Sequence, residues 1–156
     1  TFAGIRPQEV TRLTWNDIFL DTPSKVIKVR SMASKTGGTR QVSICAALES
    51  WLRIAPRQED NSICPPQWPV RWAGLRYRAG WDANGKRWPN DALRHTFASY
   101  HVLTHRDIPR LQLEMGHSSS TQIMHRYMNL SGVDQEMAEC FWNIVPEEDF
   151  YADRNA

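Results

Sequence analysis

The spacing of hydrophobic positions changes along the chain, and these changes predict the order of its secondary-structure elements. Pro7, Val10 and Leu13 have the spacing of a short helix over residues 7–14. Short runs rich in β-branched residues then predict strands over 18–20, 26–30 and 40–44. The last two flank a turn at Gly37-Gly38, which is typical of a β-hairpin. A proline-rich loop follows later, over residues 55–68. Helical spacing predicts the remaining elements, at 46–54, 69–80, 92–104, 107–115, 119–128 and 133–143.

These elements predict a single mixed domain of the α+β class, mainly helical, with a small antiparallel β-sheet packed beside a helical body. A chain of 156 residues is long enough to bury a core without disulfide or metal staples. No apolar run approaches the roughly 18–20 residues that cross a bilayer, so no membrane partner is expected. The chain begins at Thr1 without a signal-peptide pattern. The cysteines are odd in number and far apart, which favours a reducing, cytoplasmic setting: Cys45, Cys64 and Cys140.

Charge is distributed unevenly along the chain. The net charge is +2, from 19 Lys and Arg against 17 Asp and Glu. Residues 131–156 hold seven of the acids and one base, which leaves 18 bases and 10 acids, a net of +8, in residues 1–130. A basic body with an acidic tail fits a polyanion-binding surface, although a plain soluble surface with a charged tail is about as common. We expect a domain over residues 3–145 and an acidic tail over 146–156.

Arg6 and Lys35 are the first residues with a candidate chemical role. A residue before proline is pushed out of the α region, so Arg6 is expected at the entrance of the first helix, where amide donors bind anions. Glu9 is placed to orient its guanidinium. Lys35 lies near the tip of the predicted hairpin, within reach of a ligand in a groove. Taken alone, each is more often an ordinary surface charge.

Asp91, Arg94 and His117 stand beside predicted helix ends. Asp91 suits the N-cap of the helix over 92–104, and Arg94 lies three residues on, along the same side. Gly116 predicts a helix stop, with His117 opening the next helix. Tyr127 has the helical spacing of a core residue.

Two histidines form a weak metal-binding pattern. His101 and His105 are four apart on one predicted helix, but no third ligand follows at a recognised spacing. A metal-dependent hydrolase that uses these residues with His117 is therefore the least favoured hypothesis, and no metal or other cofactor is expected.

Four segments together carry a resemblance that none of them carries alone. They are AGIRPQE, SKTGGTRQVSI, DALRHTFASY and MGHSSSTQIMHRY, and they span residues 3–127. In this order they resemble the catalytic domain of the tyrosine recombinase, or phage integrase, family. RHTFAS and GHSS are the most specific parts. The resemblance implies the fold of that catalytic domain for most of the chain.

The resemblance also implies site-specific DNA cutting and rejoining through a covalent 3′-phosphotyrosine, as in type IB topoisomerases. It makes Tyr127 the nucleophile, Arg6 and Arg94 the clamp on the scissile phosphate, Lys35 the proton donor to the leaving oxygen, and His117 a phosphate ligand. Guanidinium suits the clamp because it stays charged and binds two oxygens at once. Double-stranded DNA is the implied partner, bound by a homo-oligomeric, tetrameric synapse in the full-length protein. Further bases are candidates for DNA-backbone contact: Arg40, Arg71, Arg76, Arg78, Lys86 and Arg87.

The sequence departs from the family pattern at three places. Asp91 replaces the usual histidine, and its carboxylate either accepts the tyrosyl proton, holds Arg94 or simply caps the helix. Tyr127 follows His117 by ten residues, where the family usually has nine, and Arg126 occupies the expected place. The chain begins almost at the first arginine, so we expect a catalytic domain truncated at its N-terminus.

Two questions stay open from the sequence. The helix over 133–143 has a large apolar face that packs either on its own domain or on a neighbouring subunit. The alternative to an active recombinase is a catalytically impaired, DNA-binding remnant or fragment of one, which would bind DNA with salt sensitivity but form no covalent adduct.

Overall fold

A computed structural model describes residues 1–30, 38–83, 85–117, 121 and 132–147. Two predicted site residues, Lys35 and Tyr127, lie outside these ranges. So do most of the helix predicted over 119–128 and part of the hairpin turn at Gly37-Gly38. Within the described residues, no helix is both long and apolar enough to cross a membrane.

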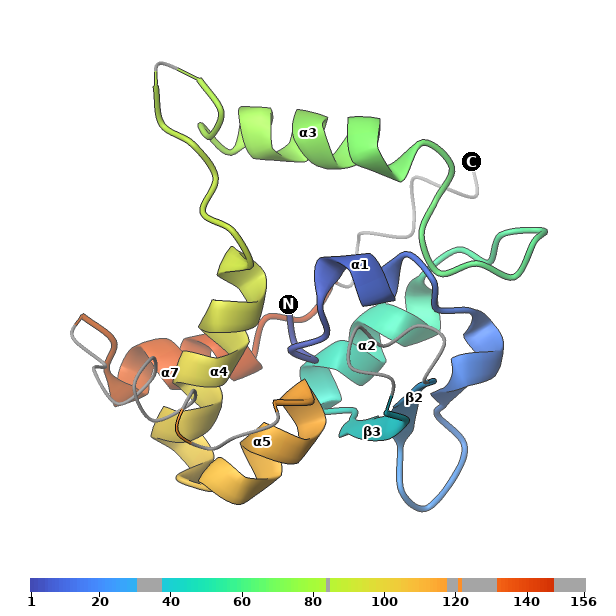
Figure 1. Ribbon diagram of the computed structural model, residues 1–156, viewed down its shortest axis with the longest axis vertical. Helices are drawn as coiled ribbons and strands as arrows, with labels where there is room; N and C mark the ends of the chain where they lie inside the picture. Colours follow the sequence, from blue (N-terminus) through green and yellow to red (C-terminus); the bar gives the residue numbers. More distant parts are fainter. Residues whose placement is uncertain (31–37, 84, 118–120, 122–131, 148–156) are drawn as a thin grey trace.

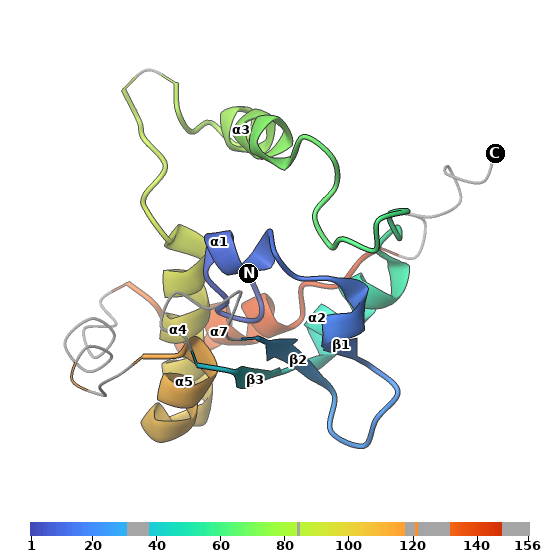
Figure 2. The same ribbon diagram turned by 45° about the vertical axis from the view of Figure 1, so that its right-hand side comes forward.

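A small antiparallel sheet lies beside helices, as the sequence predicts (Figures 1 and 2). Its three strands run in the order β1 (Ile18–Phe19), β2 (Val26–Val29) and β3 (Arg40–Ser43). The β2–β3 pair is the predicted hairpin, with Ile27 opposite Val42. Alternate residues of these strands face the core because side chains in a strand point to opposite sides.

The other regular elements of the described residues are helices. They are α1 (Pro7–Val10), α2 (Ala46–Ile54), α3 (Trp68–Arg78), α4 (Ala92–His105), α5 (Ile108–Met115) and α7 (Gln135–Trp142), with a 3-10 turn at Trp15–Asp17. The predicted boundaries agree within about two residues except at α1. Asp107 and Asp134 cap α5 and α7 with their side chains.

The helix predicted over residues 7–14 is wrong in length, because the chain leaves α1 after Val10. Residues 13–15 pair instead with the loop that follows α2. The carbonyl of Leu13 accepts from the Ile63 amide at 3.2 Å, and Trp15 donates to the Asn61 carbonyl at 3.0 Å. Leu13 is therefore buried as the sequence suggests, but against the sheet and outside the helix.

Two apolar clusters form the core. The first joins the N-terminal segment to the sheet, and it contains Ala3, Ile5, Leu13, Ile27, Val29 and Val42. The second joins α4 to α5, and it contains Phe97, Ala98, Leu111 and Met115. Gly4 lies where they meet, because a Cβ there would overlap the Phe97 ring. Its φ of +57° is a second reason for glycine at this position.

The helix α7 packs on its own domain. Phe141 stacks on Tyr100 with ring centroids 4.6 Å apart, and Trp142 donates through Nε1 to the Thr104 hydroxyl at 2.9 Å. Of the two sequence interpretations, the structure bears out packing within the domain for residues 135–142.

The helix α3 stands away from the rest of the domain (Figures 1 and 2). None of its residues is fully buried. Trp72 of α3 meets Trp88 edge-on in the turn that follows the helix, and Trp88 also meets Trp81 edge-on. This arrangement leaves one face of α3 open, with Val70 and Tyr77 about two-thirds exposed, at 70% and 67%.

Candidate active site

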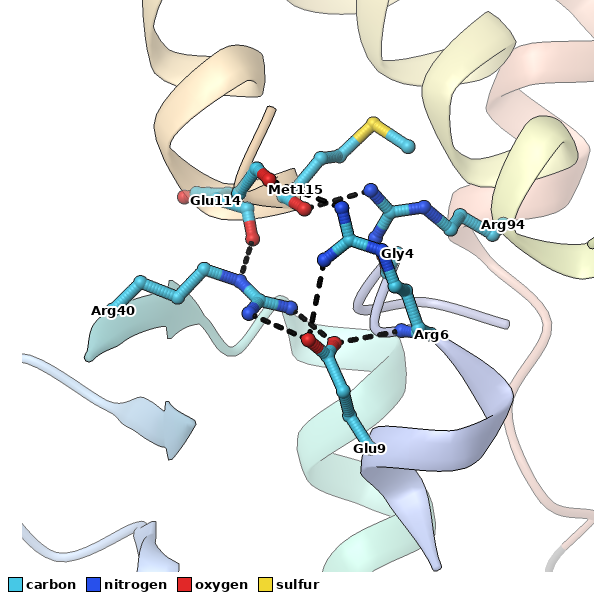
Figure 3. Close-up of polar contacts among 8 residues, drawn as sticks. Gly4, Arg6, Glu9, Arg40, Arg94, Glu114 and Met115 are labelled. Atoms are coloured by element: carbon cyan, nitrogen blue, oxygen red, sulfur yellow. Dashed lines mark hydrogen bonds and ion pairs between the residues drawn. The ribbon is translucent and has the colours of Figure 1, made fainter. Parts of the chain in front are cut away.

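The end of α5 gathers three arginines from three separate elements (Figure 3). They donate to three consecutive backbone carbonyls: Arg40 to Glu114 (2.8 Å), Arg94 to Met115 (2.7 Å) and Arg6 to Gly116 (3.1 Å). The last carbonyls of a helix have no partner within it, and they form the negative end of its dipole. This end of α5 therefore attracts and orients cationic side chains.

Gly116 ends α5 as the sequence predicts. It adopts φ +63°, the left-handed conformation that favours glycine, and its amide closes the last turn. A Cβ at this position would lie 3.1–3.3 Å from the Arg40 side chain. The absence of a side chain thus lets a guanidinium approach the helix end closely.

Arg6 occupies the N-cap position of α1, as its place before Pro7 predicts. Its backbone amide donates to Glu9 Oε2 at 3.1 Å, and its Nη1 lies 3.2 Å from Glu9 Oε1. Glu9 therefore orients the guanidinium, which confirms that part of the sequence prediction. With the bond to Gly116, Arg6 uses two of its five side-chain N–H donors within the described part of the chain, and its side chain is 20% exposed.

Arg94 is buried in the first turn of α4. Its Nη1 donates to the carbonyl of Gly4, and its Nη2 donates to that of Met115. The side chain therefore links the N-terminal segment, α4 and the end of α5. His117 follows Gly116 directly and is half-buried, and its backbone amide donates to the Gln112 carbonyl at 3.1 Å. Arg6, Arg94 and His117 thus meet at one end of α5.

Glu9 is the buried carboxylate at the centre of this site. It is 1% exposed, and both of its oxygens accept from Arg40, at 3.1 and 2.5 Å. Burial by itself raises the pKa of Glu9, but hydrogen bonds and charge from Arg40 and Arg6 outweigh it and hold the pKa below its usual value. Glu9 is therefore ionised at neutral pH and balances part of the arginine charge.

Asp91 does not cap α4 through its side chain, and that prediction is wrong. It occupies the N-cap position, but at φ +54°, and its exposed carboxylate makes no capping hydrogen bond. A capping side chain needs an extended backbone to aim its oxygen at the amides of the first turn. Asp91 remains three residues before Arg94, at the N-terminal end of the same helix.

The other predicted DNA contacts fall into two groups. Arg40 is drawn into the arginine site, where its side chain is only 9% exposed. The rest lie on α3 and the turn after it. Arg76 pairs with Asp82 at 2.5 Å and lies over Trp72, and Lys86 lies over Trp81. The exposed members of this second group are Arg71, Arg78, Lys86 and Arg87.

The histidine pair lies in a different place. His101 is buried between Phe97 and His105, with its ring 4.7 Å from that of His105. Burial, followed by the charge of His105, lowers the pKa of His101 to about 4. Among the residues that the structure describes, no three His, Cys, Asp or Glu side chains are grouped to hold a metal ion.

Sequence reasoning missed the acceptors of the site. They are the backbone carbonyls of Gly4, Glu114, Met115 and Gly116, which have no side-chain signature. The sequence signals that could have indicated these acceptors are Gly4, Gly116 and the predicted end of the helix. Whether such carbonyls accept from arginines depends on which segments the fold brings against them.

Comparison with known proteins shows which family the chain belongs to. The model of the phage integrase family matches residues 2–132. The chain belongs to the phage integrase family. No curated protein matches the chain.

Solved structures of recombinases share the fold of this phage integrase domain. XerA recombinase is 19% identical with a TM-score of 0.59, over 90% of this chain and 53% of that one. XerH recombinase, bound to its difH substrate before cleavage, is 22% identical with a TM-score of 0.57, over 92% and 43%. The Tn1549 transposon integrase in complex with circular intermediate DNA is 17% identical with a TM-score of 0.58, over 90% and 54%. The chain thus spans about half the length of these proteins.

Proposed function

We propose that this chain is the catalytic domain of a site-specific DNA recombinase that cuts and rejoins DNA strands through a covalent 3′-phosphotyrosine. The observation that carries the proposal is the meeting of Arg6, Arg94 and His117 at the end of α5. Membership of the phage integrase family supports it, as does the fold shared with DNA-bound recombinases.

The arrangement suits phosphoryl transfer. Negative charge spreads over the phosphate oxygens in the transition state, so fixed guanidinium groups stabilise that state most. Arg6 and Arg94 are proposed to bind the non-bridging oxygens, and His117 to hydrogen-bond to the same phosphate. Because both guanidiniums are already held by backbone carbonyls, little reorganisation is needed when the phosphate arrives.

Tyr127 and Lys35 complete the proposed mechanism from the sequence. The Tyr127 phenol attacks phosphorus, and its proton passes to a base, for which Asp91 is a candidate. The bond to the 5′ oxygen breaks, and Lys35 supplies the proton to that leaving oxygen. One phosphodiester replaces another, so the step needs no cofactor, and the free 5′ hydroxyl of a second strand reverses it.

The helix α3 and its turn are proposed to contact the DNA backbone. Residues 68–90 carry five basic residues and one acid, Asp82. The unit stands off the domain and exposes most of these charges, as a surface that follows a duplex requires (Figure 2). Strand exchange joins two duplexes, so the full-length protein is further proposed to act as a homo-oligomer, with a tetrameric synapse as its active form.

A covalent-adduct assay tests the function. The full-length protein is incubated with a nicked duplex that carries its recombination site, so that the cleaved strand diffuses away and the adduct accumulates. We expect a protein–DNA adduct with the wild type and none with Tyr127→Phe. Tyr100→Phe is the matched control, because it keeps the ring that stacks on Phe141.

The same assay distinguishes the alternative. Salt-sensitive DNA binding without any adduct from the wild type would identify a DNA-binding remnant and overturn the proposed activity. An adduct that persists in Tyr127→Phe would show that another residue is the nucleophile.

A further inference from the structure

We propose that Arg40 is a positioning residue, which fixes the two phosphate-binding arginines and does not contact the DNA backbone. This inference rests on the proposed function. It concerns a side chain that the sequence groups with the surface bases and that the structure places inside the domain.

The donors of Arg40 point inward (Figure 3). Nη1 and Nη2 donate to the two oxygens of Glu9 at 3.1 and 2.5 Å, and Nε donates to the carbonyl of Glu114 at 2.8 Å. All three of its nitrogens are thus engaged within the protein, and the side chain is 9% exposed. A side chain bound in this way has little capacity left for a DNA phosphate.

Arg40 joins three segments of the domain. It is the first residue of β3, Glu9 belongs to α1, and Glu114 belongs to the last turn of α5. Val29 lies opposite Arg40 in the hairpin, so the sheet fixes its backbone. The guanidinium therefore holds α1 and the end of α5 at a set position relative to the sheet.

Both proposed phosphate ligands depend on that position. Glu9 is the group that orients Arg6, and Arg40 is its stronger partner, with two bonds to the carboxylate against one from the Arg6 side chain. The carbonyl that accepts from Arg40 directly precedes the two carbonyls that accept from Arg94 and Arg6. Loss of Arg40 would release Glu9 toward Arg6 and loosen the helix end that holds both guanidiniums.

The test compares three variants by the single-turnover rate of adduct formation and by the salt dependence of DNA binding. Arg40→Gln is expected to slow adduct formation about 10- to 100-fold, because a displacement near 1 Å costs up to about that much. Its slope of log affinity against log salt should equal that of the wild type. Arg78→Gln is the reference for a DNA-backbone contact, and it should reduce the magnitude of that slope by about one. Arg53→Gln breaks an arginine–glutamate pair far from the site and should leave the rate unchanged.

Further variants separate positioning from a general loss of stability. Arg40→Lys keeps a charge beside Glu9 but cannot make all three bonds, so its rate should fall between those of the wild type and Arg40→Gln. The double variant Arg40→Gln/Glu9→Gln should be no slower than the slower single variant, because both changes act on the same contact. If Arg40→Gln does not fold, the rate and the salt slope of Arg40→Lys are compared with those of the wild type instead.

An activity-independent measurement keeps the two proposals separate. In NMR spectra of arginine Nε–H groups, Arg40→Gln should shift the signals of Arg6 and Arg94, whereas Arg53→Gln should not. Unmoved signals would overturn the positioning role even if no variant forms an adduct. If Arg40→Gln forms the adduct at the wild-type rate but has a salt slope about one smaller in magnitude than that of the wild type, Arg40 contacts the DNA backbone instead.

Discussion

The guanidinium of Arg6 donates to the carbonyl of Gly116 at 3.1 Å, a contact between residues that lie 110 positions apart in the chain. It joins the AGIRPQE segment at the start of the chain to the glycine–histidine segment after α5. The bond forms because α5 ends at Gly116 and leaves its last carbonyls without partners inside the helix. His117 is thereby placed one residue from the carbonyl that holds Arg6.

Arg94→Lys should separate charge from geometry in the site. Lysine keeps the positive charge, but all its donors are on one nitrogen, so it cannot reproduce the fork by which Nη1 and Nη2 of Arg94 bond to Gly4 and Met115. We expect the rate of adduct formation to fall by on the order of a hundredfold or more. Arg53→Lys, at an exposed ion pair, is the control. A rate within twofold of the wild type would show that charge alone is sufficient.

Gly4→Ala should destabilise the domain more than an equivalent change elsewhere. The left-handed conformation costs a non-glycine residue about 1–2 kcal/mol, and the overlap with Phe97 adds about 1–3 kcal/mol. Gly80→Ala has a similar positive φ, +79°, but nothing lies within 4 Å of its Cβ, so it measures the conformational cost alone. Urea unfolding of both variants checks the prediction. Equal losses would mean that the Phe97 ring moves aside freely.

Acid should weaken the domain through Glu9. Its pKa is lowered in the folded protein, so its contribution is complete above its usual value of 4.5 and is lost as the pH falls through the folded pKa. We expect the urea midpoint to decrease below about pH 4.5. Glu9→Gln should be less stable at pH 7 and should lose part of this acid dependence. An identical pH profile for the variant and the wild type would contradict the prediction.

His101 should add a separate loss of stability at milder acidity. Its folded pKa of about 4 lies below the usual 6.5, so the unfolded chain binds a proton first and stability falls between pH 6.5 and 4. Its surroundings are mixed: His105 and Arg110 lower the pKa, whereas Glu114 and Asp107 raise it. A difference of this size is worth about 3 kcal/mol.

His101→Leu tests this assignment. The variant removes the titrating group and keeps an apolar side chain beside Phe97, so thermal unfolding should become nearly independent of pH between 6.5 and 5. The variant should retain the acid loss below pH 4.5 that Glu9 causes. If the stability of His101→Leu still falls between pH 6.5 and 5 as steeply as that of the wild type, another group causes the fall.

Much of the fold could be predicted from local patterns. The helix α2 lies at its predicted limits, and the β2–β3 hairpin pairs as the alternation of Ile27 and Val42 requires. The exceptions arose from tertiary contacts. Leu13 has helical spacing, but it pairs with the loop at Ile63 instead of extending the helix. Asp91 is a residue type that often caps helices, but its positive φ does not aim the carboxylate at the amides of the first turn.

The sequence by itself determined the candidates for the chemistry: Arg6, Arg94 and His117 lie in segments that resemble family motifs, and Gly116 marks the helix end at which they meet. Only the tertiary structure decided what holds these groups. It placed Arg40 against Glu9 and assigned one carbonyl of α5 to each arginine. The physical reason is that backbone carbonyls are the same in every residue, so their value as ligands depends on the segments that long-range packing brings against them.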